Sequence, residues 1–168
     1  LKKDKQVREL NPSMGGGCVY EMGSYPLLPI FKLMGTQYDN LNFYSRMEDG
    51  LDIYTRGVMH FSNAVCSFKL GMGVKTEGNL VISGTKGYVY VPSPWWKMDY
   101  YELRYEDQNE NKKYFYKLDG EGLRYEIHEF FSCIFNKRYS SVRLRKNECV
   151  AMAGVMEQFK EKKNFFNI

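Results

Sequence analysis

A glutamate and a tyrosine, Glu21 and Tyr25, stand four residues apart just after three consecutive glycines, Gly15, Gly16 and Gly17. On a helix this spacing puts both side chains on one face, within reach of a single ligand hydroxyl. A phenol can transfer the hydroxyl proton while the carboxylate orients that hydroxyl. Glycines let the main chain approach a flat ligand closely, so the three are expected to form a wall against a cofactor ring. The residues alone leave a structural alternative open, with Glu21 a surface or capping carboxylate and Tyr25 part of the core.

A second stretch with binding chemistry is the loop in which Trp95, Trp96 and Lys97 follow two prolines. Exposed indoles stack on the apolar faces of sugar rings or fill a partner's pocket. Because adjacent side chains alternate between faces, one of the two tryptophans is expected in the core. Lys97 carries the charge to meet a phosphate or carboxylate of a ligand, although a loop lysine is more often simply solvated. All three residues are candidates for substrate binding.

The elements that must position these residues follow from the spacing of the apolar side chains. Residues 18–35 are apolar and helix-like, but Gly23, Pro26 and Pro29 interrupt them, which predicts a broken helix. Residues 52–118 are rich in Tyr, Phe, Val and Thr and are divided by Gly and Asn, which predicts strands. Apolar stripes within residues 127–135 and 150–159 predict two further helices.

Helices before and after a run of strands, rather than alternating with them, indicate an α+β fold. The expected sheet is open, mixed but predominantly antiparallel, with about six or more strands, because no helices separate the strands. Helices should pack on one face. The other face is expected to be aromatic and to meet a substrate or a second copy in a homodimer or tetramer. The rings behind this expectation are those of Tyr54, Tyr88, Tyr90, Tyr100, Tyr101, Tyr105, Tyr114 and Tyr116.

The composition favours one domain over residues 1–168 and excludes several classes of partner. The net charge is only +4, and no predicted strand combines its aromatics with a basic stripe, so no nucleic acid is expected as a partner. No apolar stretch approaches the roughly 18 residues of a membrane helix, and the start lacks the apolar core of a signal peptide. We therefore expect no membrane partner and a cytoplasmic location. The first residue is leucine, which indicates a piece of a longer protein.

The four cysteines, Cys18, Cys66, Cys133 and Cys149, have neither C-x-x-C spacing nor a histidine beside them. This pattern signals neither a metal site nor a disulfide framework, so no metal is expected. We expect the four to be buried thiols.

Three segments, in order, resemble the C-terminal domain of the Gfo/Idh/MocA family of NAD(P)-dependent oxidoreductases. "GGGCVYEMGSYPLLPIFKLMG" resembles the family's G-G-G-x-x-x-D-x-G-x-H segment. "LVISGTKGYVYVPSPWW" resembles its I-x-G-x-x-G hairpin, and "EGLRYEIHEFFSCIFNKR" resembles its closing helix. The glycine segment is the most specific of the three.

The resemblance implies roles for the residues of the glycine segment. Tyr25 stands at the family's catalytic His or Tyr position and Glu21 at its usual Asp position, whereas Leu28 replaces an acid that many members carry. The resemblance also implies that NAD or NADP is bound mainly by a preceding Rossmann domain, absent from this chain, and that a lysine of that domain lowers the tyrosine pKa. This chain alone is then expected to hold no cofactor and to have no activity.

The sequence therefore predicts the C-terminal substrate-binding and oligomerisation domain of a dehydrogenase that acts on a sugar, polyol or nucleotide sugar. Tyr25 would handle the hydroxyl proton and Glu21 would position it. The alternative is a non-catalytic carbohydrate-binding or oligomerisation scaffold that pairs through its aromatic sheet.

Overall fold

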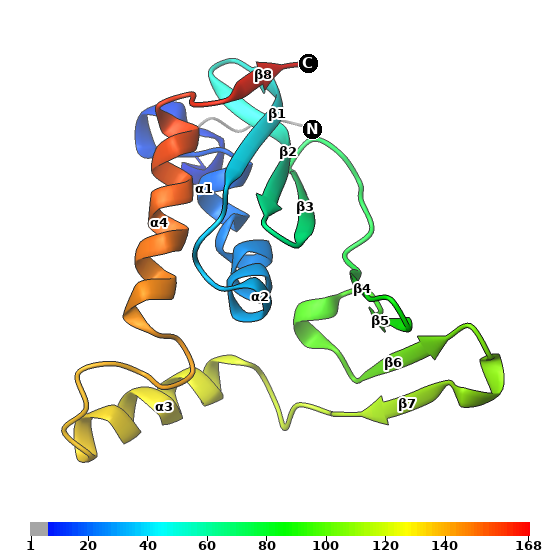
Figure 1. The fold of residues 1–168 in the computed structure, drawn as a ribbon. Helices are drawn as coiled ribbons and strands as arrows, with labels where there is room; N and C mark the ends of the chain where they lie inside the picture. Colours follow the sequence, from blue (N-terminus) through cyan, green and yellow to red (C-terminus); the bar gives the residue numbers. More distant parts are fainter. Residues whose placement is uncertain (1–6) are drawn as a thin grey trace. The chain divides into compact units, whose positions relative to one another are not determined.

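The computed structural model describes residues 7–168, which separate into two compact units (Figure 1). The first unit contains residues 7–75 and 142–168, and the second contains residues 76–141. Each unit has its own open four-stranded sheet, and helices flank the strands along the chain. The predicted α+β class is confirmed, with the eight strands divided between two sheets.

The sheet of the first unit has the strand order β3-β2-β1-β8. Its strands are β1 (Asn40–Glu48), β2 (Leu51–Phe61), β3 (Ala64–Gly71) and β8 (Phe165–Asn167). β1, β2 and β3 pair antiparallel, and β8 adds a parallel edge to β1. Asp49 and Gly50 both have positive φ, as a tight hairpin turn between β1 and β2 requires.

Three helices cover one face of this sheet: α1 (Cys18–Met22), α2 (Ser24–Met34) and α4 (Lys146–Lys160) (Figure 1). Alternate strand residues point toward these helices, and residues of the opposite parity remain more exposed. The buried core between sheet and helices consists of Cys18, Val19, Leu27, Phe31, Leu41, Phe43, Met59, Phe61, Phe68, Leu70, Met152, Val155 and Phe159.

The helical segment that follows the glycines is divided into two helices near Gly23, as predicted, but Pro26 and Pro29 lie within α2 and do not end it. α1 ends at Met22, α2 begins at Ser24, and Pro29 lies inside α2. Two short 3-10 helices, η1 (Arg8–Leu10) and η2 (Pro12–Met14), precede the glycines. No helix within residues 7–168 has the length and hydropathy needed to cross a bilayer.

The sheet of the second unit is antiparallel, with the strand order β4-β5-β6-β7. Its strands are β4 (Leu80–Ser83), β5 (Gly87–Val91), β6 (Tyr100–Tyr105) and β7 (Lys112–Phe115). Two 3-10 helices, η3 (Trp95–Lys97) and η4 (Gln108–Glu110), lie in the connections.

The tyrosines do not gather on one face as expected. Tyr54 belongs to the first sheet, and side chains alternate along β5, β6 and β7, so the remaining rings divide between the two faces of the second sheet. On one face, the Arg104 guanidinium lies 4.4 Å from the Tyr90 ring centroid and forms an ion pair with Glu102 at 2.6 Å. Lys113 Nζ lies 3.5 Å from the Tyr100 ring centroid. Cation–π contacts with Arg104 and Lys113 therefore engage the Tyr90 and Tyr100 rings within the unit.

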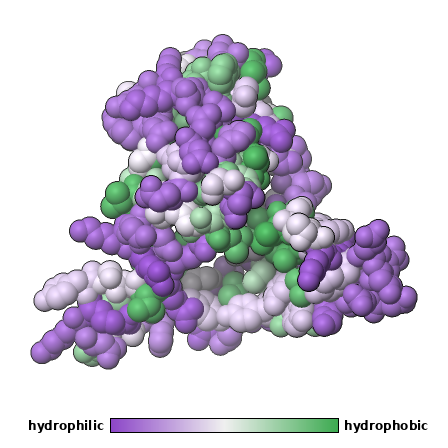
Figure 2. Space-filling view, in the orientation of Figure 1, coloured by the Kyte–Doolittle hydropathy of each residue, from purple (hydrophilic) through white to green (hydrophobic). Residues whose placement is uncertain are grey.

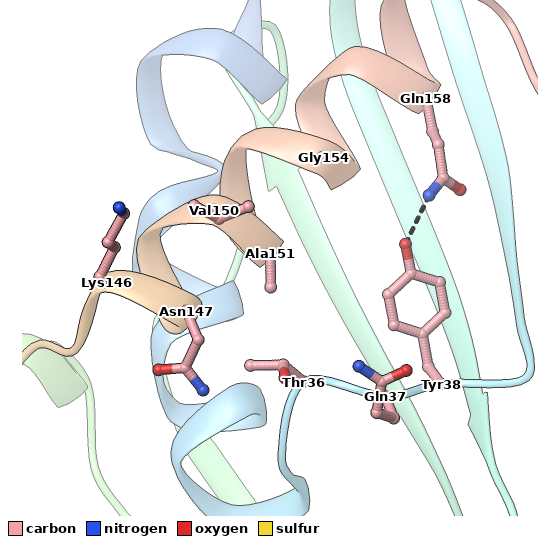
Figure 3. Close-up of a pocket in the computed structure, with 9 residues that line it drawn as sticks. All are labelled: Thr36, Gln37, Tyr38, Lys146, Asn147, Val150, Ala151, Gly154 and Gln158. Atoms are coloured by element: carbon pink, nitrogen blue, oxygen red, sulfur yellow. Dashed lines mark hydrogen bonds between the residues drawn. The ribbon is translucent and has the colours of Figure 1, made fainter.

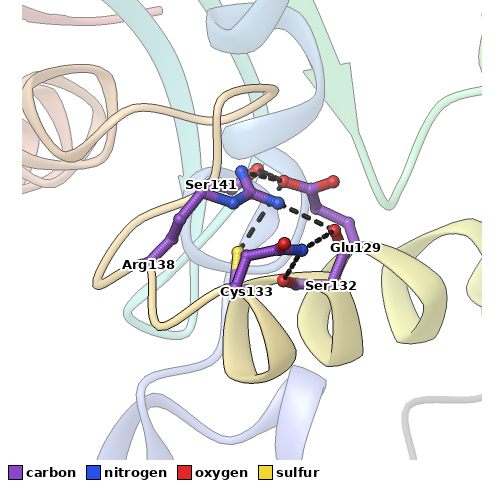
Figure 4. Close-up of polar contacts among 6 residues, drawn as sticks. Glu129, Ser132, Cys133, Arg138 and Ser141 are labelled. Atoms are coloured by element: carbon purple, nitrogen blue, oxygen red, sulfur yellow. Dashed lines mark hydrogen bonds and ion pairs between the residues drawn. The ribbon is translucent and has the colours of Figure 1, made fainter.

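Helix α3 (Leu123–Phe135) presents the predicted apolar stripe, but its phenylalanines are at least half exposed. The helix ends in a polar cluster (Figure 4). Glu129 Oε1 accepts a hydrogen bond from Ser141 Oγ at 2.8 Å and lies 3.4 Å from Arg138 Nη1, and Arg138 also donates to Ser132 Oγ at 2.9 Å. These bonds fold the chain after α3 back onto the helix. On the side of the molecule seen in Figure 2, hydrophilic side chains predominate, and hydrophobic ones form smaller groups between them.

Candidate functional site

The helical path from α1 to α2 is nearly continuous and carries both Glu21 and Tyr25. Gly23, between the two helices, keeps helical dihedral angles (φ −61°, ψ −32°). Its amide donates to Val19 O at 2.8 Å, and its carbonyl accepts from Leu27 N at 3.3 Å. Glu21 and Tyr25 therefore occupy neighbouring positions one helical turn apart, as their spacing predicted. The Tyr25 side chain is half exposed and is not part of the core.

The three glycines that precede α1 differ in what surrounds them. A Cβ on Gly16 would lie 2.5 Å from Glu9 O and 2.8 Å from Arg8 O, and a Cβ on Gly17 would overlap Asp52 Oδ1. A Cβ on Gly15 would meet no atom of the described residues within 4 Å. Close packing within the protein therefore explains why glycine occupies positions 16 and 17. Of the three glycines, only Gly15 leaves its main chain open among the described residues.

Asp52 is buried and fixes the start of α1. Its Oδ2 accepts hydrogen bonds from Val19 N at 2.9 Å, Cys18 Sγ at 2.8 Å and Thr55 Oγ1 at 3.0 Å. The Thr55 hydroxyl in turn bonds to Ser45 Oγ at 2.8 Å. A carboxylate at a helix N-terminus satisfies otherwise unpaired amides and interacts favourably with the helix dipole. Burial, together with the charge of Asp52, raises the pKa of the Cys18 thiol far above its ordinary value.

Arg8 supplies a cation at the candidate site. Its Nη2 lies 2.6 Å from Glu21 Oε2, with the Glu21 side chain 15% exposed and the Arg8 side chain 52% exposed. Thirteen residues separate Arg8 from Glu21, so local spacing in the sequence does not reveal this pair. The one sign of it in the sequence is that Arg8 stands shortly before the glycine segment.

An apolar cup in the second unit includes two of the residues predicted to bind substrate. It has a volume of about 430 Å³ and is lined almost entirely by carbon atoms. Trp95 and Trp96 meet edge to face there, with their ring centroids 6.2 Å apart, and Trp96 is about half exposed. The lining residues are Leu80, Val89, Val91, Trp95, Trp96, Met98, Tyr101, Tyr116 and Leu118. Such a cup suits the face of a ring better than a charged group.

Lys97, the third residue predicted to bind substrate, does not line the cup. Its Nζ forms an exposed ion pair with Glu121 Oε2 at 2.9 Å. The structure therefore brings the two tryptophans together at one cavity and directs the lysine to a carboxylate of the chain.

A larger and more open groove lies in the first unit, between α4 and the segment after α2 (Figure 3). Its volume is about 820 Å³, and its polar groups include Lys146, Asn147 and Gln37. Gln158 Nε2 donates to the Tyr38 hydroxyl at 2.5 Å along one wall. No residue predicted to be functional lines this groove.

The cysteines are free thiols, but they are not uniformly buried. Cys18 is buried, Cys66 and Cys133 are half-buried, and Cys149 is exposed, so the expectation of four buried thiols is correct only for Cys18. Among residues 7–168, no three His, Cys, Asp or Glu side chains gather as they would to hold a metal ion.

Comparison with known proteins gives a fold match without a sequence match. No protein-family model matches the chain, and no curated protein sequence does. KijD10, a 3-ketoreductase from Actinomadura kijaniata solved with NADP and TDP-benzene, superposes with a TM-score of 0.80 at 11% identity, over 99% of this chain and 52% of KijD10. Levoglucosan dehydrogenase, in complex with NADH and levoglucosan, gives a TM-score of 0.70 at 16% identity, over 96% of this chain and 53% of the dehydrogenase. The chain has the fold of these oxidoreductases.

These superpositions confirm the fold that was expected from the sequence. The chain spans about half the length of the solved structures that it matches. Both neighbours were solved with a nicotinamide cofactor, and their ligands are TDP-benzene and levoglucosan.

Proposed function

We propose that this chain is the substrate-binding half of a nicotinamide-dependent oxidoreductase of the Gfo/Idh/MocA type, acting on a sugar, polyol or nucleotide sugar. The observation that carries the proposal is the fold match over 99% of the chain with KijD10. The placement of Glu21 and Tyr25 on one helical path, directly after the glycine segment, adds the chemical groups that such a reaction needs.

In this proposal Tyr25 takes the hydroxyl proton of the substrate during oxidation and returns it during reduction. Glu21 accepts a hydrogen bond from the same hydroxyl and fixes its orientation. The nicotinamide, when bound, supplies the hydride acceptor or donor. An unperturbed tyrosine has a pKa of about 10, so this role requires a cation beside the phenol, and we assign that cation to a lysine outside this chain.

The remaining candidates receive supporting roles. Gly15 offers bare main chain to the cofactor ring, whereas Gly16 and Gly17 hold the segment in shape. Trp95 and Trp96 provide a face on which a sugar ring or the base of a nucleotide sugar stacks. Lys97 would meet a ligand only after release from Glu121.

We further propose that the two units work together as one substrate-binding and oligomerisation domain of a cytoplasmic homodimer or tetramer. The face of the first sheet opposite α1, α2 and α4 supports this proposal, since no helix in the described part of the first unit covers it (Figure 1). That face carries the exposed Arg46 and Arg56 and the half-buried Tyr44 and Tyr54, and tyrosine and arginine are enriched in protein interfaces.

The test is cofactor-dependent turnover by the full-length protein. NAD and NADP are each supplied with a panel of aldoses, polyols and nucleotide sugars, and the formation of reduced cofactor is followed. We expect turnover with at least one pair, and none from residues 1–168 alone. A full-length protein that binds neither cofactor, yet forms oligomers and changes its tryptophan fluorescence with sugar, would establish the carbohydrate-binding scaffold instead.

A further inference from the structure

We propose that Arg8 is the positioning residue for Glu21, holding one carboxylate oxygen so that the other accepts the substrate hydroxyl. This inference rests on the proposed function and adds a residue to its site.

The contact between the two residues leaves half of the carboxylate free. Arg8 Nη2 lies 2.6 Å from Glu21 Oε2, slightly less than the roughly 2.7–2.9 Å typical of a charge-assisted hydrogen bond between these groups. Among residues 7–168, Glu21 Oε1 has no hydrogen-bond or ion-pair partner. A carboxylate anchored through one oxygen has a defined orientation and keeps an acceptor for a ligand.

The glycine segment explains why Arg8 lies at this place. Gly17 N donates to Glu9 O at 3.0 Å, and Gly16 N donates to Asn11 O at 3.0 Å, so the main chain of η1 lies directly against the glycines. A side chain on Gly16 would push the carbonyls of Arg8 and Glu9 away. The bare backbone at Gly16 therefore permits the close approach that brings the Arg8 guanidinium to Glu21.

Stability alone gives little reason for this pair. The Arg8 side chain is half exposed, and ion pairs with a solvent-exposed member usually contribute little to the free energy of unfolding. Arg8 also has a second acidic neighbour, Glu9 Oε1, at the longer distance of 3.9 Å. The short bond goes instead to the carboxylate that precedes Tyr25 by one helical turn. The preference of Arg8 for Glu21 over Glu9 therefore supports a role in positioning the Glu21 carboxylate.

The experiment is a double-mutant cycle in the full-length protein, with kcat, KM and cofactor Kd measured for Arg8→Ala, Glu21→Gln and the double variant. We expect Arg8→Ala to lower kcat/KM by between about tenfold and 100-fold, as a small misplacement of a positioning group does, with cofactor Kd unchanged. In the Glu21→Gln background, Arg8→Ala should have almost no further effect. Arg8→Lys should restore part of the loss, since lysine keeps the charge but not the planar geometry.

Two further measurements separate positioning from folding. Added guanidinium ion, at concentrations too low to unfold the protein, should raise the turnover of Arg8→Ala but not that of Glu21→Gln. Glu9→Gln, which removes the more distant carboxylate, should keep wild-type kinetics. If the loss of kcat/KM in the double variant equalled the product of the two single losses, Arg8 would not act through Glu21. A failure of guanidinium to raise the turnover of Arg8→Ala would likewise overturn the role of Arg8. A wild-type protein without turnover on any substrate would instead overturn the proposed function, and this inference with it.

Discussion

The Asp52 carboxylate lies directly against Gly17, with Oδ1 in the place that a side chain at Gly17 would occupy. Gly17 also has a φ of 116°, which few residues other than glycine adopt. From this position the carboxylate accepts hydrogen bonds from the Val19 amide and the Cys18 thiol, so Gly17 and Asp52 together set where the helix with Glu21 begins.

This relationship predicts a graded effect of alanine along the glycine segment. Gly17→Ala should destabilise the protein by at least about 2 kcal/mol, since it adds backbone strain to a steric overlap. Gly15→Ala should cost only about 1 kcal/mol, because its φ of 72° is left-handed but its surroundings are open. Urea unfolding followed by circular dichroism measures both. Equal destabilisation by the two substitutions would show that Asp52 does not confine Gly17.

The state of the Cys18 thiol predicts selective alkylation. Burial and Asp52 raise its pKa, so the folded protein keeps this thiol neutral at about pH 8, where an ordinary cysteine is partly ionised. Iodoacetamide should therefore modify exposed Cys149 first and leave Cys18 unmodified until urea unfolds the chain, as peptide mass analysis would show. The unfolded thiol ionises above about pH 8.5 and the folded one does not, so this group lowers stability as pH rises further. Modification of Cys18 as fast as Cys149 in the folded protein would contradict the buried network.

The ion pair between α2 and α4 predicts a pH-dependent contribution to stability. Lys32 Nζ lies 2.7 Å from Glu148 Oε2, and this hydrogen bond, with one from Arg145 N, lowers the Glu148 pKa. The contribution should be complete above the unfolded pKa of about 4.3 and should disappear as pH falls through the lower folded pKa. Glu148→Gln should therefore lower Tm at neutral pH, and the difference from wild type should shrink under acidic conditions.

The solvent-facing Glu157→Gln on the same helix is the matched control and should leave Tm nearly unchanged. A Tm difference for Glu148→Gln that stays constant from neutral to acidic pH would mean that the ionised carboxylate is not what stabilises the pairing of these helices.

The apolar cup predicts a preference among glycosides. Because its lining is almost free of polar groups, phenyl β-glucoside should change the tryptophan fluorescence at concentrations at which methyl β-glucoside does not. Trp96→Ala should abolish the response, and Lys86→Met, in the turn between β4 and β5, should preserve it. Equal responses to the two glycosides, or a response that survives Trp96→Ala, would remove the cup as a binding site for rings.

The sequence predicted relations that are local in the chain. The neighbouring positions of Glu21 and Tyr25 follow from helical spacing, and the break near Gly23 follows from the proline and glycine chemistry of the segment. The long-range relations were missed. The parallel pairing of Phe43 with Phe165, and the bond from Cys18 to Asp52, depend on how separate elements pack. Local periodicity carries no information about such contacts, and it also gave no sign that the strands divide into two sheets.

The most direct test of the account is the kinetics of Tyr25→Phe in the full-length protein, with its best sugar or polyol substrate. The substitution keeps the ring but removes the hydroxyl that exchanges the substrate proton. We predict a fall in kcat of about 100-fold or more, the range of general acid–base catalysis, with cofactor Kd within about twofold of wild type. An unchanged kcat would contradict the assignment of Tyr25 as the acid–base residue, and with it the roles proposed for Glu21 and Arg8.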